Sequence, residues 1–101
     1  MPKAITKQQV QEMQYEKVKL IDIRSMEEYK TLHIPEVINI PAENLAKELA
    51  TFNEEDTIVC ICNHGKERSQ QAAEFLYNAG FKNAFYLQGG TTGWYDLKKS
   101  T

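Results

Sequence analysis

Short apolar runs of strand length recur along the chain, separated by stretches in which apolar residues follow helical spacing. The first run contains Leu20, Ile21 and Ile23, and so many large aliphatic residues suit a strand that is covered on both faces, as in a parallel sheet. Polar or turn-forming residues stand at both ends of these runs, as they usually do at the ends of strands. The pattern predicts four strands, at residues 17–24, 37–40, 57–61 and 84–87.

Helices are predicted before the first strand, at residues 6–13, and between the strands, at residues 25–29, 42–52 and 70–79. Thr6 with Gln9, and Ser25 with Glu28, have the spacing of a capping box, which satisfies backbone N–H groups at the start of a helix. Gly80 stands where a helix would end in a left-handed residue. Because strands alternate with helices, we predict an α/β fold with a parallel sheet covered by helices on both faces.

Composition and charge narrow the classes of function. The chain has 101 residues, of which 42% are hydrophobic and 26% charged, which fits one domain over residues 1–101 and excludes disordered and coiled-coil proteins. A net charge of −2 gives no basic surface, so neither nucleic acid nor membrane is an expected partner. The sequence has no apolar run of membrane-spanning length and no apolar core of a signal peptide near residues 1–5, so we expect a cytoplasmic location.

Both cysteines are expected to be reduced thiols. Cys60 and Cys62 are two residues apart in a strand-like run, where disulfide geometry is hard to satisfy, and a disulfide framework would need more cysteines. A zinc site that uses both cysteines and His64 is conceivable, but the sequence has no second cluster of ligands and the spacing is not that of a zinc finger. We therefore predict no metal and no organic cofactor.

A loop that opens on a cysteine follows the third predicted strand and runs straight into a helix. If this loop curls around Cys62, its backbone N–H groups and the helix dipole favour a thiolate, the nucleophilic form, so Cys62 is the predicted catalytic residue. Arg68 adds a planar cation that fits an oxyanion, and Lys66 adds a mobile one. The predicted substrate-binding residues are Asn63, His64, Gly65, Lys66, Glu67 and Arg68.

The loop resembles that of the rhodanese (sulfurtransferase) domains, which carry Cys-x-x-Gly-x-Arg-Ser between a strand and a helix. Cys62, Gly65, Arg68 and Ser69 match this motif with one extra residue before the arginine. The resulting Cys-x5-Arg spacing is similar to the loop of the cysteine-dependent phosphatases and of the rhodanese-fold arsenate reductases. In the family, the shorter loop suits a persulfide sulfur and the longer loop suits a tetrahedral phosphate or arsenate.

Other segments, from about residue 5 to residue 97, are similar to the same family. Residues 20–41 are similar to its signature, although Leu32 and Glu36 stand where the family usually has glycine. The backbone conformation of this turn is therefore not predicted. Residues 87–94 are similar to its closing Leu-x-Gly-Gly-x-x-x-Trp motif. The resemblance implies a five-stranded, mostly parallel sheet. It also implies supporting roles near the catalytic loop for Asp22, Arg24 and Ser69, while His33 and Trp94 are expected to be structural.

The lead hypothesis is a sulfurtransferase of the thiosulfate type. Cys62 would attack the outer sulfur of thiosulfate or of a protein persulfide, hold it as a cysteine persulfide, and pass it to a thiol or cyanide. The loop N–H groups would stabilise the charge, and Arg68 and Lys66 would hold the anionic donor.

Two alternatives stay open. One is a phosphatase or arsenate reductase that uses the same thiolate, although Ile61 stands where such phosphatases usually have histidine and no motif identifies a general acid. The other is a sulfur carrier or regulatory module without free turnover, whose donor or acceptor is another protein.

Overall fold

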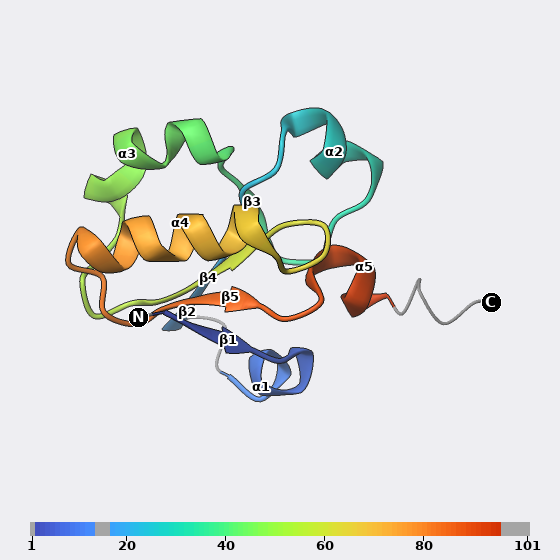
Figure 1. The fold of residues 1–101 in the computed structure, drawn as a ribbon, viewed down its shortest axis with the longest axis horizontal. Coiled ribbons are helices and arrows are strands. Elements are labelled where there is room, and N and C mark those ends of the chain that lie inside the picture. The colour runs from blue at the N-terminus through green and yellow to red at the C-terminus, as the bar shows by residue number, and fades with distance from the viewer. Residues whose placement is uncertain (1, 14–16, 96–101) are drawn as a thin grey trace.

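The computed structural model describes residues 2–13 and 17–95, which are built around a five-stranded sheet (Figure 1). The order of the strands is β1-β5-β4-β2-β3, and every pairing between neighbours is parallel. The predicted α/β fold and the five strands that the resemblance implies are confirmed, and β4 is the central strand. The strands are β1 (Lys3–Ile5), β2 (Val18–Asp22), β3 (Ile38–Asn39), β4 (Thr57–Ile61) and β5 (Ala84–Leu87).

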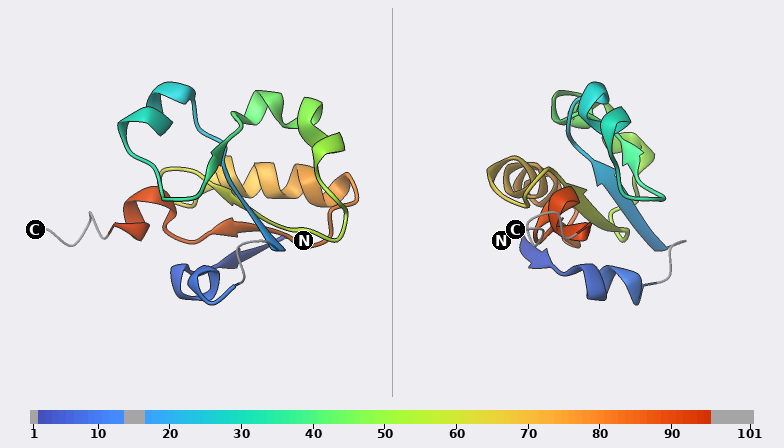
Figure 2. Two further views of the ribbon diagram at one scale, coloured as in Figure 1. Left: turned by 180° about the vertical axis from the view of Figure 1, so that it is seen from behind. Right: turned by 90° about the vertical axis from the view of Figure 1, so that its right-hand side faces the viewer.

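Helices cover both faces of the sheet. Figure 1 shows α3 and α4 on one side of the strands and α1 on the other, and the side view in Figure 2 shows the same layers. No helix in the described part of the chain is both long and apolar enough to span a bilayer. The helices are α1 (Lys7–Gln11), α2 (Met26–Thr31), α3 (Leu45–Glu48), α4 (Glu67–Asn78) and α5 (Gly90–Trp94), and the 3-10 turns η2 (Ala42–Asn44) and η3 (Leu49–Thr51) flank α3.

Two hydrophobic clusters lie on opposite faces of the sheet, because successive side chains of a strand point to opposite sides. Ile21 of β2 belongs to the cluster that packs against α3 and α4, whereas its neighbour Leu20 belongs to the cluster that packs against α1. Trp94 is partly buried against this second cluster, so its expected role as a core residue is confirmed. The end of the stretch that resembles the family, residues 96–97, lies outside the described residues.

Local sequence signals fix where several helices begin and end. Both predicted capping boxes are present, at the start of α1 and at the start of α2. Gly80, with a φ of 109°, is the left-handed residue predicted at the end of α4, and Phe81 N–H donates to Leu76 O at 3.0 Å, so the chain folds back on the helix. His33 is held at its turn, because its Nδ1 donates to Tyr29 O at 2.8 Å and its ring stacks on the Tyr29 ring with 4.0 Å between centroids.

Two features differ from the sequence pattern. Strand β1 is missing from the pattern because it has three residues of which only Ile5 is buried, too few to show a period. The single helix predicted over residues 42–52 is instead α3 between two 3-10 turns. It is interrupted at Asn44 and Glu48, where ψ is −2° and 2°, values at which the backbone tightens out of the α-helix.

The turn between α2 and β3 contains one strained residue. Glu36 has a φ of 72°, a left-handed conformation that costs a non-glycine residue about 1–2 kcal/mol. Leu32 is extended, with a φ of −164°, and needs no glycine. Of the two departures from the family pattern, only the one at Glu36 therefore introduces strain.

Replacing Glu36 with glycine is expected to stabilise the protein by about 0.5–1 kcal/mol. The substitution removes the strain, while the greater freedom of glycine in the unfolded chain offsets part of the gain. Thermal unfolding should show a midpoint higher by about 3–6 °C. The Glu36→Ala variant is the control: it keeps a Cβ, so its midpoint should stay near that of the wild type, and an equal rise in both variants would contradict the strain.

Candidate active site

Cys62 directly follows the central strand β4, at the carboxyl ends of the strands, where open α/β sheets bind their ligands. The loop that it opens closes over a pocket of about 250 Å³. The structure thus brings together six of the seven residues predicted for catalysis and substrate binding. The residues that line the pocket are Cys62, Asn63, His64, Lys66, Glu67 and Arg68.

The sulfur of Cys62 is buried and surrounded by hydrogen-bond partners. The side chain is 3% exposed, and Ser69 Oγ lies 3.2 Å from Sγ. Burial alone would raise the pKa of Cys62, but hydrogen bonds from the Ser69 hydroxyl and from the backbone N–H groups of Lys66, Ser69 and His64 outweigh it, so the pKa is lowered. The predicted curl of the loop around the sulfur is therefore present, and it favours the thiolate.

Ser69 has a second contact that matters for the thiol. Its Oγ lies 3.2 Å from Lys66 O as well as 3.2 Å from the Cys62 sulfur. When Cys62 is protonated, its S–H can donate to Ser69 Oγ while the hydroxyl donates to Lys66 O. When Cys62 is ionised, the hydroxyl can turn and donate to the sulfur. Ser69 can therefore pair with the sulfur in both charge states.

Cys60 has a different environment from Cys62, although both are free thiols. Cys60 is wholly buried in the cluster under α4, and burial, with a smaller contribution from the charge of Cys62, raises its pKa to about 12. It stays protonated and acts as a small apolar core residue. Within residues 2–13 and 17–95, no three histidine, cysteine or acidic side chains lie close enough together to hold a metal ion.

The start of α5 holds the backbone of the loop. Thr91 N–H donates to Cys62 O at 2.9 Å, and Thr92 donates to Asn63 O from its N–H at 3.0 Å and from its hydroxyl at 2.9 Å. Because these two carbonyls point at α5, the N–H groups of the same peptide units, those of Asn63 and His64, point the other way, and the His64 N–H is one of the donors to the Cys62 sulfur. His64 Nδ1 lies 2.9 Å from the Thr92 hydroxyl, which also fixes the side chain of His64.

Two glycines let the backbone of the Cys62 loop lie this close to the backbone that follows β5. Gly65 has a φ of 70°, and a Cβ on it would overlap the backbone of Leu87. Gly90 has a φ of 60°, and a Cβ on it would overlap the carbonyls of Cys62 and Asn63. Gly65 therefore allows the loop to pack against the chain after β5, since no side chain fits there, and it does not line the pocket.

A buried arginine supports the loop from below. Arg24, 3% exposed, donates from Nε and Nη2 to the Asp22 carboxylate at 2.9 and 2.6 Å and from Nη2 to Leu32 O at 2.6 Å. Its Nη1 donates to Asn63 Oδ1 at 2.8 Å. The ion pair satisfies the two buried charges, and its outer nitrogen fixes the first residue after Cys62, which fits the supporting role predicted for Asp22 and Arg24.

Glu28 of α2 lies at the rim of the site, and sequence analysis assigned it only to a capping box. Arg68 donates to both of its carboxylate oxygens, at 2.9 and 3.2 Å, and Asn63 Nδ2 donates to Oε2 at 3.1 Å. Oε1 also accepts from Ser25 N–H at 3.0 Å. The bond from Arg68 is the main reason that the pKa of Glu28 is lowered to about 2. Arg68, predicted to be a cation for the substrate, is thus already paired.

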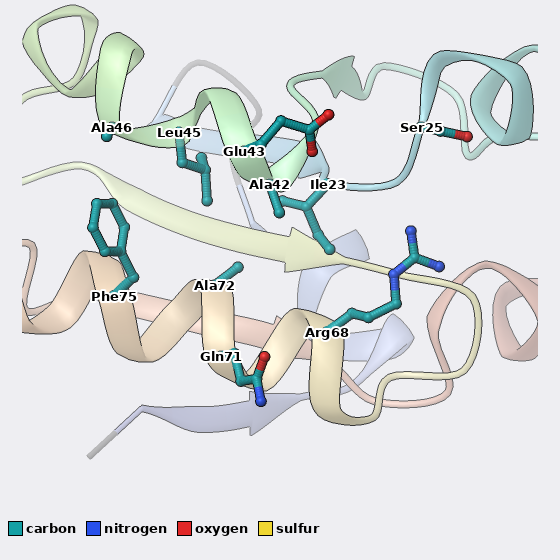
Figure 3. Close-up of a pocket in the computed structure, with 10 residues that line it drawn as sticks. All are labelled: Ile23, Ser25, Ala42, Glu43, Leu45, Ala46, Arg68, Gln71, Ala72 and Phe75. Carbon is teal, nitrogen blue, oxygen red and sulfur yellow. The ribbon is translucent and has the colours of Figure 1, made fainter.

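An apolar groove lies on the other side of Arg68 (Figure 3). Its volume is about 490 Å³, and it runs between η2 and α3 on one side and α4 on the other. Phe75, 42% exposed, and Leu45 form part of its walls, and Arg68 closes one end. Arg68 therefore lines both the groove and the Cys62 pocket.

Helix α4 begins at Glu67, three residues earlier than the predicted segment 70–79. This places Arg68 and Ser69 in the first turn of the helix, and the loop between strand and helix is correspondingly shorter. The side chain of Arg68 consequently leaves the helix towards α2, while Ser69 is buried and faces the sulfur.

The chain is similar to several known proteins. The thiosulfate sulfurtransferase GlpE of Shewanella oneidensis is 33% identical over 89 residues, which cover 88% of this chain and 87% of that protein. The putative sulfur carrier protein YrkF of Bacillus subtilis is 37% identical over 79 residues, which cover 78% of this chain but less than half, 42%, of YrkF. The crystal structure of a rhodanese-related protein from Thermoplasma volcanium superposes with a TM-score of 0.80 at 27% identity, covering 94% of this chain and 92% of that chain. The sequence model of the rhodanese-like domain family matches residues 6–97, so the chain belongs to this family.

Proposed function

We propose that the protein is a sulfurtransferase that carries a sulfur atom on Cys62 as a persulfide. The observation that supports this most directly is the buried sulfur with a lowered pKa, held by the Ser69 hydroxyl and three backbone N–H groups. Such a ring of donors stabilises a negative sulfur, whether it belongs to the thiolate or to the outer atom of a persulfide. The names of GlpE and YrkF, a thiosulfate sulfurtransferase and a putative sulfur carrier, point to the same chemistry.

The proposed cycle has two displacement steps. The Cys62 thiolate attacks the outer sulfur of the donor, the sulfur–sulfur bond of the donor breaks, and its electron pair leaves with sulfite or with a thiolate. Cys62 then carries the sulfur as a persulfide anion. In the second step an acceptor thiolate attacks this outer sulfur, and Cys62 leaves as the thiolate. Cys62 thus returns to its starting oxidation state, and the acceptor carries the sulfur as a persulfide.

The partners that fit this cycle are a small donor such as thiosulfate, a protein persulfide donor, and a thiol acceptor. Cys62 has to stay reduced between cycles, and a low-pKa thiol is kept reduced in the cytoplasm, where we expect the protein to act. Where the second partner is a protein, the domain works as a carrier, and the groove beside Arg68 is close enough to the pocket to contact such a partner.

The intact mass of the non-reduced protein tests this proposal. After incubation with thiosulfate or with glutathione persulfide, we expect a gain of one sulfur atom, which cyanide removes. A folded protein that gains no sulfur from either donor, but whose Cys62 still alkylates readily, would contradict it.

The Cys-x5-Arg spacing favours a phosphatase or arsenate reductase as the second candidate function. Added vanadate distinguishes the two. Protection of Cys62 from alkylation by vanadate, together with the absence of a sulfur gain, would favour the second candidate. The pairing of Arg68 with Glu28 supports the first, because a phosphate-binding loop needs this arginine directed at the anion.

A further inference from the structure

Glu28 is the meeting point of the polar groups at the rim of the Cys62 pocket. Its two oxygens accept four hydrogen bonds, from Arg68 twice, from Asn63 Nδ2 and from Ser25 N–H. Figure 3 shows the Arg68 side chain leaving the start of α4 in the direction of Ser25 at the start of α2. The guanidinium is therefore engaged with a carboxylate through both of its terminal nitrogens, the geometry in which arginine binds an anion best.

The orientation of Asn63 strengthens this arrangement. Arg24 has only donors and Glu28 has only acceptors, so Asn63 Oδ1 must face Arg24 and Nδ2 must face Glu28. The buried ion pair under the loop therefore holds Asn63, and Asn63 helps to hold Glu28 against Arg68. Glu28 is one third exposed and Arg68 about half exposed, at 34% and 48%, so an anion can reach the pair from solvent.

The charges around the sulfur leave little attraction for a dianion. The Cys62 thiolate and the Glu67 carboxylate at the pocket are negative, and Glu28 neutralises Arg68. Lys66 is the one cation lining the pocket that has no ion pair among the described residues, and Glu67 is its neighbour in the chain. Among the described residues, Lys66 is then the unpaired cation open to a thiosulfate ion, which would have to compete with Glu28 for Arg68.

We propose that Glu28 is a specificity-determining residue that withholds Arg68 from the donor, so that the site takes sulfur from persulfides in preference to thiosulfate. This inference rests on the proposed sulfurtransferase function. With a persulfide donor, the Cys62 thiolate takes the outer sulfur and the bond pair leaves on a thiolate with a single charge. With thiosulfate, the sulfur–sulfur bond of that ion breaks, and its electron pair leaves on sulfite, a dianion that needs a cation beside it.

The test compares kcat/KM for thiosulfate and for glutathione persulfide in the wild type and in Glu28→Gln. Glutamine keeps a carbonyl oxygen for Ser25 N–H, so the capping box of α2 is retained, but it removes the charge that holds Arg68. We expect the wild type to favour glutathione persulfide by about tenfold or more. In Glu28→Gln, kcat/KM for thiosulfate should rise about tenfold, mainly through a lower KM, and that for glutathione persulfide should change less than about threefold.

Three further variants isolate the cause. Glu27→Gln makes the same charge change one residue away, in the exposed first turn of α2. It should leave the ratio of kcat/KM for the two donors unchanged. The double variant Glu28→Gln with Arg68→Gln should lose the gain in thiosulfate use, because the freed cation is then absent. If Glu28→Gln folds poorly, Glu28→Asp keeps the charge on a side chain too short for the double contact and should shift the ratio in the same direction.

The outcomes separate the inference from the function on which it rests. A wild type that uses both donors equally well, or equal donor ratios in Glu28→Gln and Glu27→Gln, would overturn the role of Glu28 while sulfur transfer itself stands. If neither donor places a sulfur on Cys62 in any variant, the proposed function fails and the inference fails with it. A change in thermal midpoint without a change in the ratio would mark Glu28 as a structural residue only.

Discussion

Replacing Cys62 with serine is expected to reduce sulfur transfer at least about a thousandfold with either donor. A serine hydroxyl is not ionised at neutral pH, and an oxygen cannot carry the transferred sulfur through a sulfur–sulfur bond. The fold should be retained, because serine has nearly the shape of cysteine and the Oγ would find the same donors, the Ser69 hydroxyl and the loop N–H groups, that surround the sulfur. Activity and bound sulfur should be lost together while the thermal midpoint changes little.

The matched control is Cys60→Ala. Cys60 is on the same strand two residues earlier, but it is wholly buried and burial raises its pKa to about 12, so it cannot act as a thiolate near neutral pH. Its removal should lower the free energy of unfolding by about 1–2 kcal/mol, because a small cavity is left, without preventing sulfur transfer. Near-wild-type turnover in Cys62→Ser, or loss of the sulfur gain in folded Cys60→Ala, would contradict a persulfide on Cys62.

The apolar pattern was enough to predict the fold because most elements carry their own local signal. Residues 57–61 are a short apolar run, and the Ser25 and Glu28 capping box starts α2 where the spacing says it should. Strand β1 carries no such signal, since its three residues become a strand only by pairing with β5, which follows some eighty residues later in the chain. Such pairing depends on tertiary structure, and a local window of sequence does not contain it.

The candidate site was predictable to the extent that it lies within one stretch of sequence. The loop from Cys62 to Ser69 is continuous, so the residues up to Arg68 could be named from the loop itself, and Ser69 from the resemblance to the rhodanese family. Thr91 and Thr92, whose backbone and side chain hold the loop, were missed. The signal for them was topological: β5 lies next to β4 in the sheet, so the residues after β5 meet the loop at the same edge. The contacts of Glu28 with Arg68 and Asn63 were also missed, because its capping box with Ser25 already explained that residue.

Replacing Gly90 with alanine is expected to lower the rate of sulfur transfer by about a hundredfold and the free energy of unfolding by about 2–4 kcal/mol. Gly90 has a φ of 60°, which strains alanine, and the new Cβ would overlap the carbonyl oxygens of Cys62 and Asn63. These are the two carbonyls that accept hydrogen bonds from the start of α5. Since both are backbone atoms, the loop has to move, and the N–H groups that face the sulfur move with it.

Alkylation of Cys62 as a function of pH reports this movement separately from stability. In the wild type, the hydrogen bonds lower the pKa of the thiol, so alkylation should begin at a lower pH than for an ordinary cysteine. In Gly90→Ala, burial still raises the pKa while the opposing bonds are weakened, so the midpoint of alkylation should move to higher pH.

Gly93→Ala is the control within the same short helix. A Cβ on Gly93 would lie 3.9 Å from Gln88 O, an ordinary contact, and Gly93 is outside the left-handed region. Alanine also favours a helix over glycine, so this variant should keep both rate and pKa and gain up to about 1 kcal/mol in stability. If Gly90→Ala matched Gly93→Ala in the pH of alkylation, the start of α5 would have no part in lowering the pKa of Cys62. The ionised sulfur would then depend on Ser69 and on the N–H groups of the loop without support from α5.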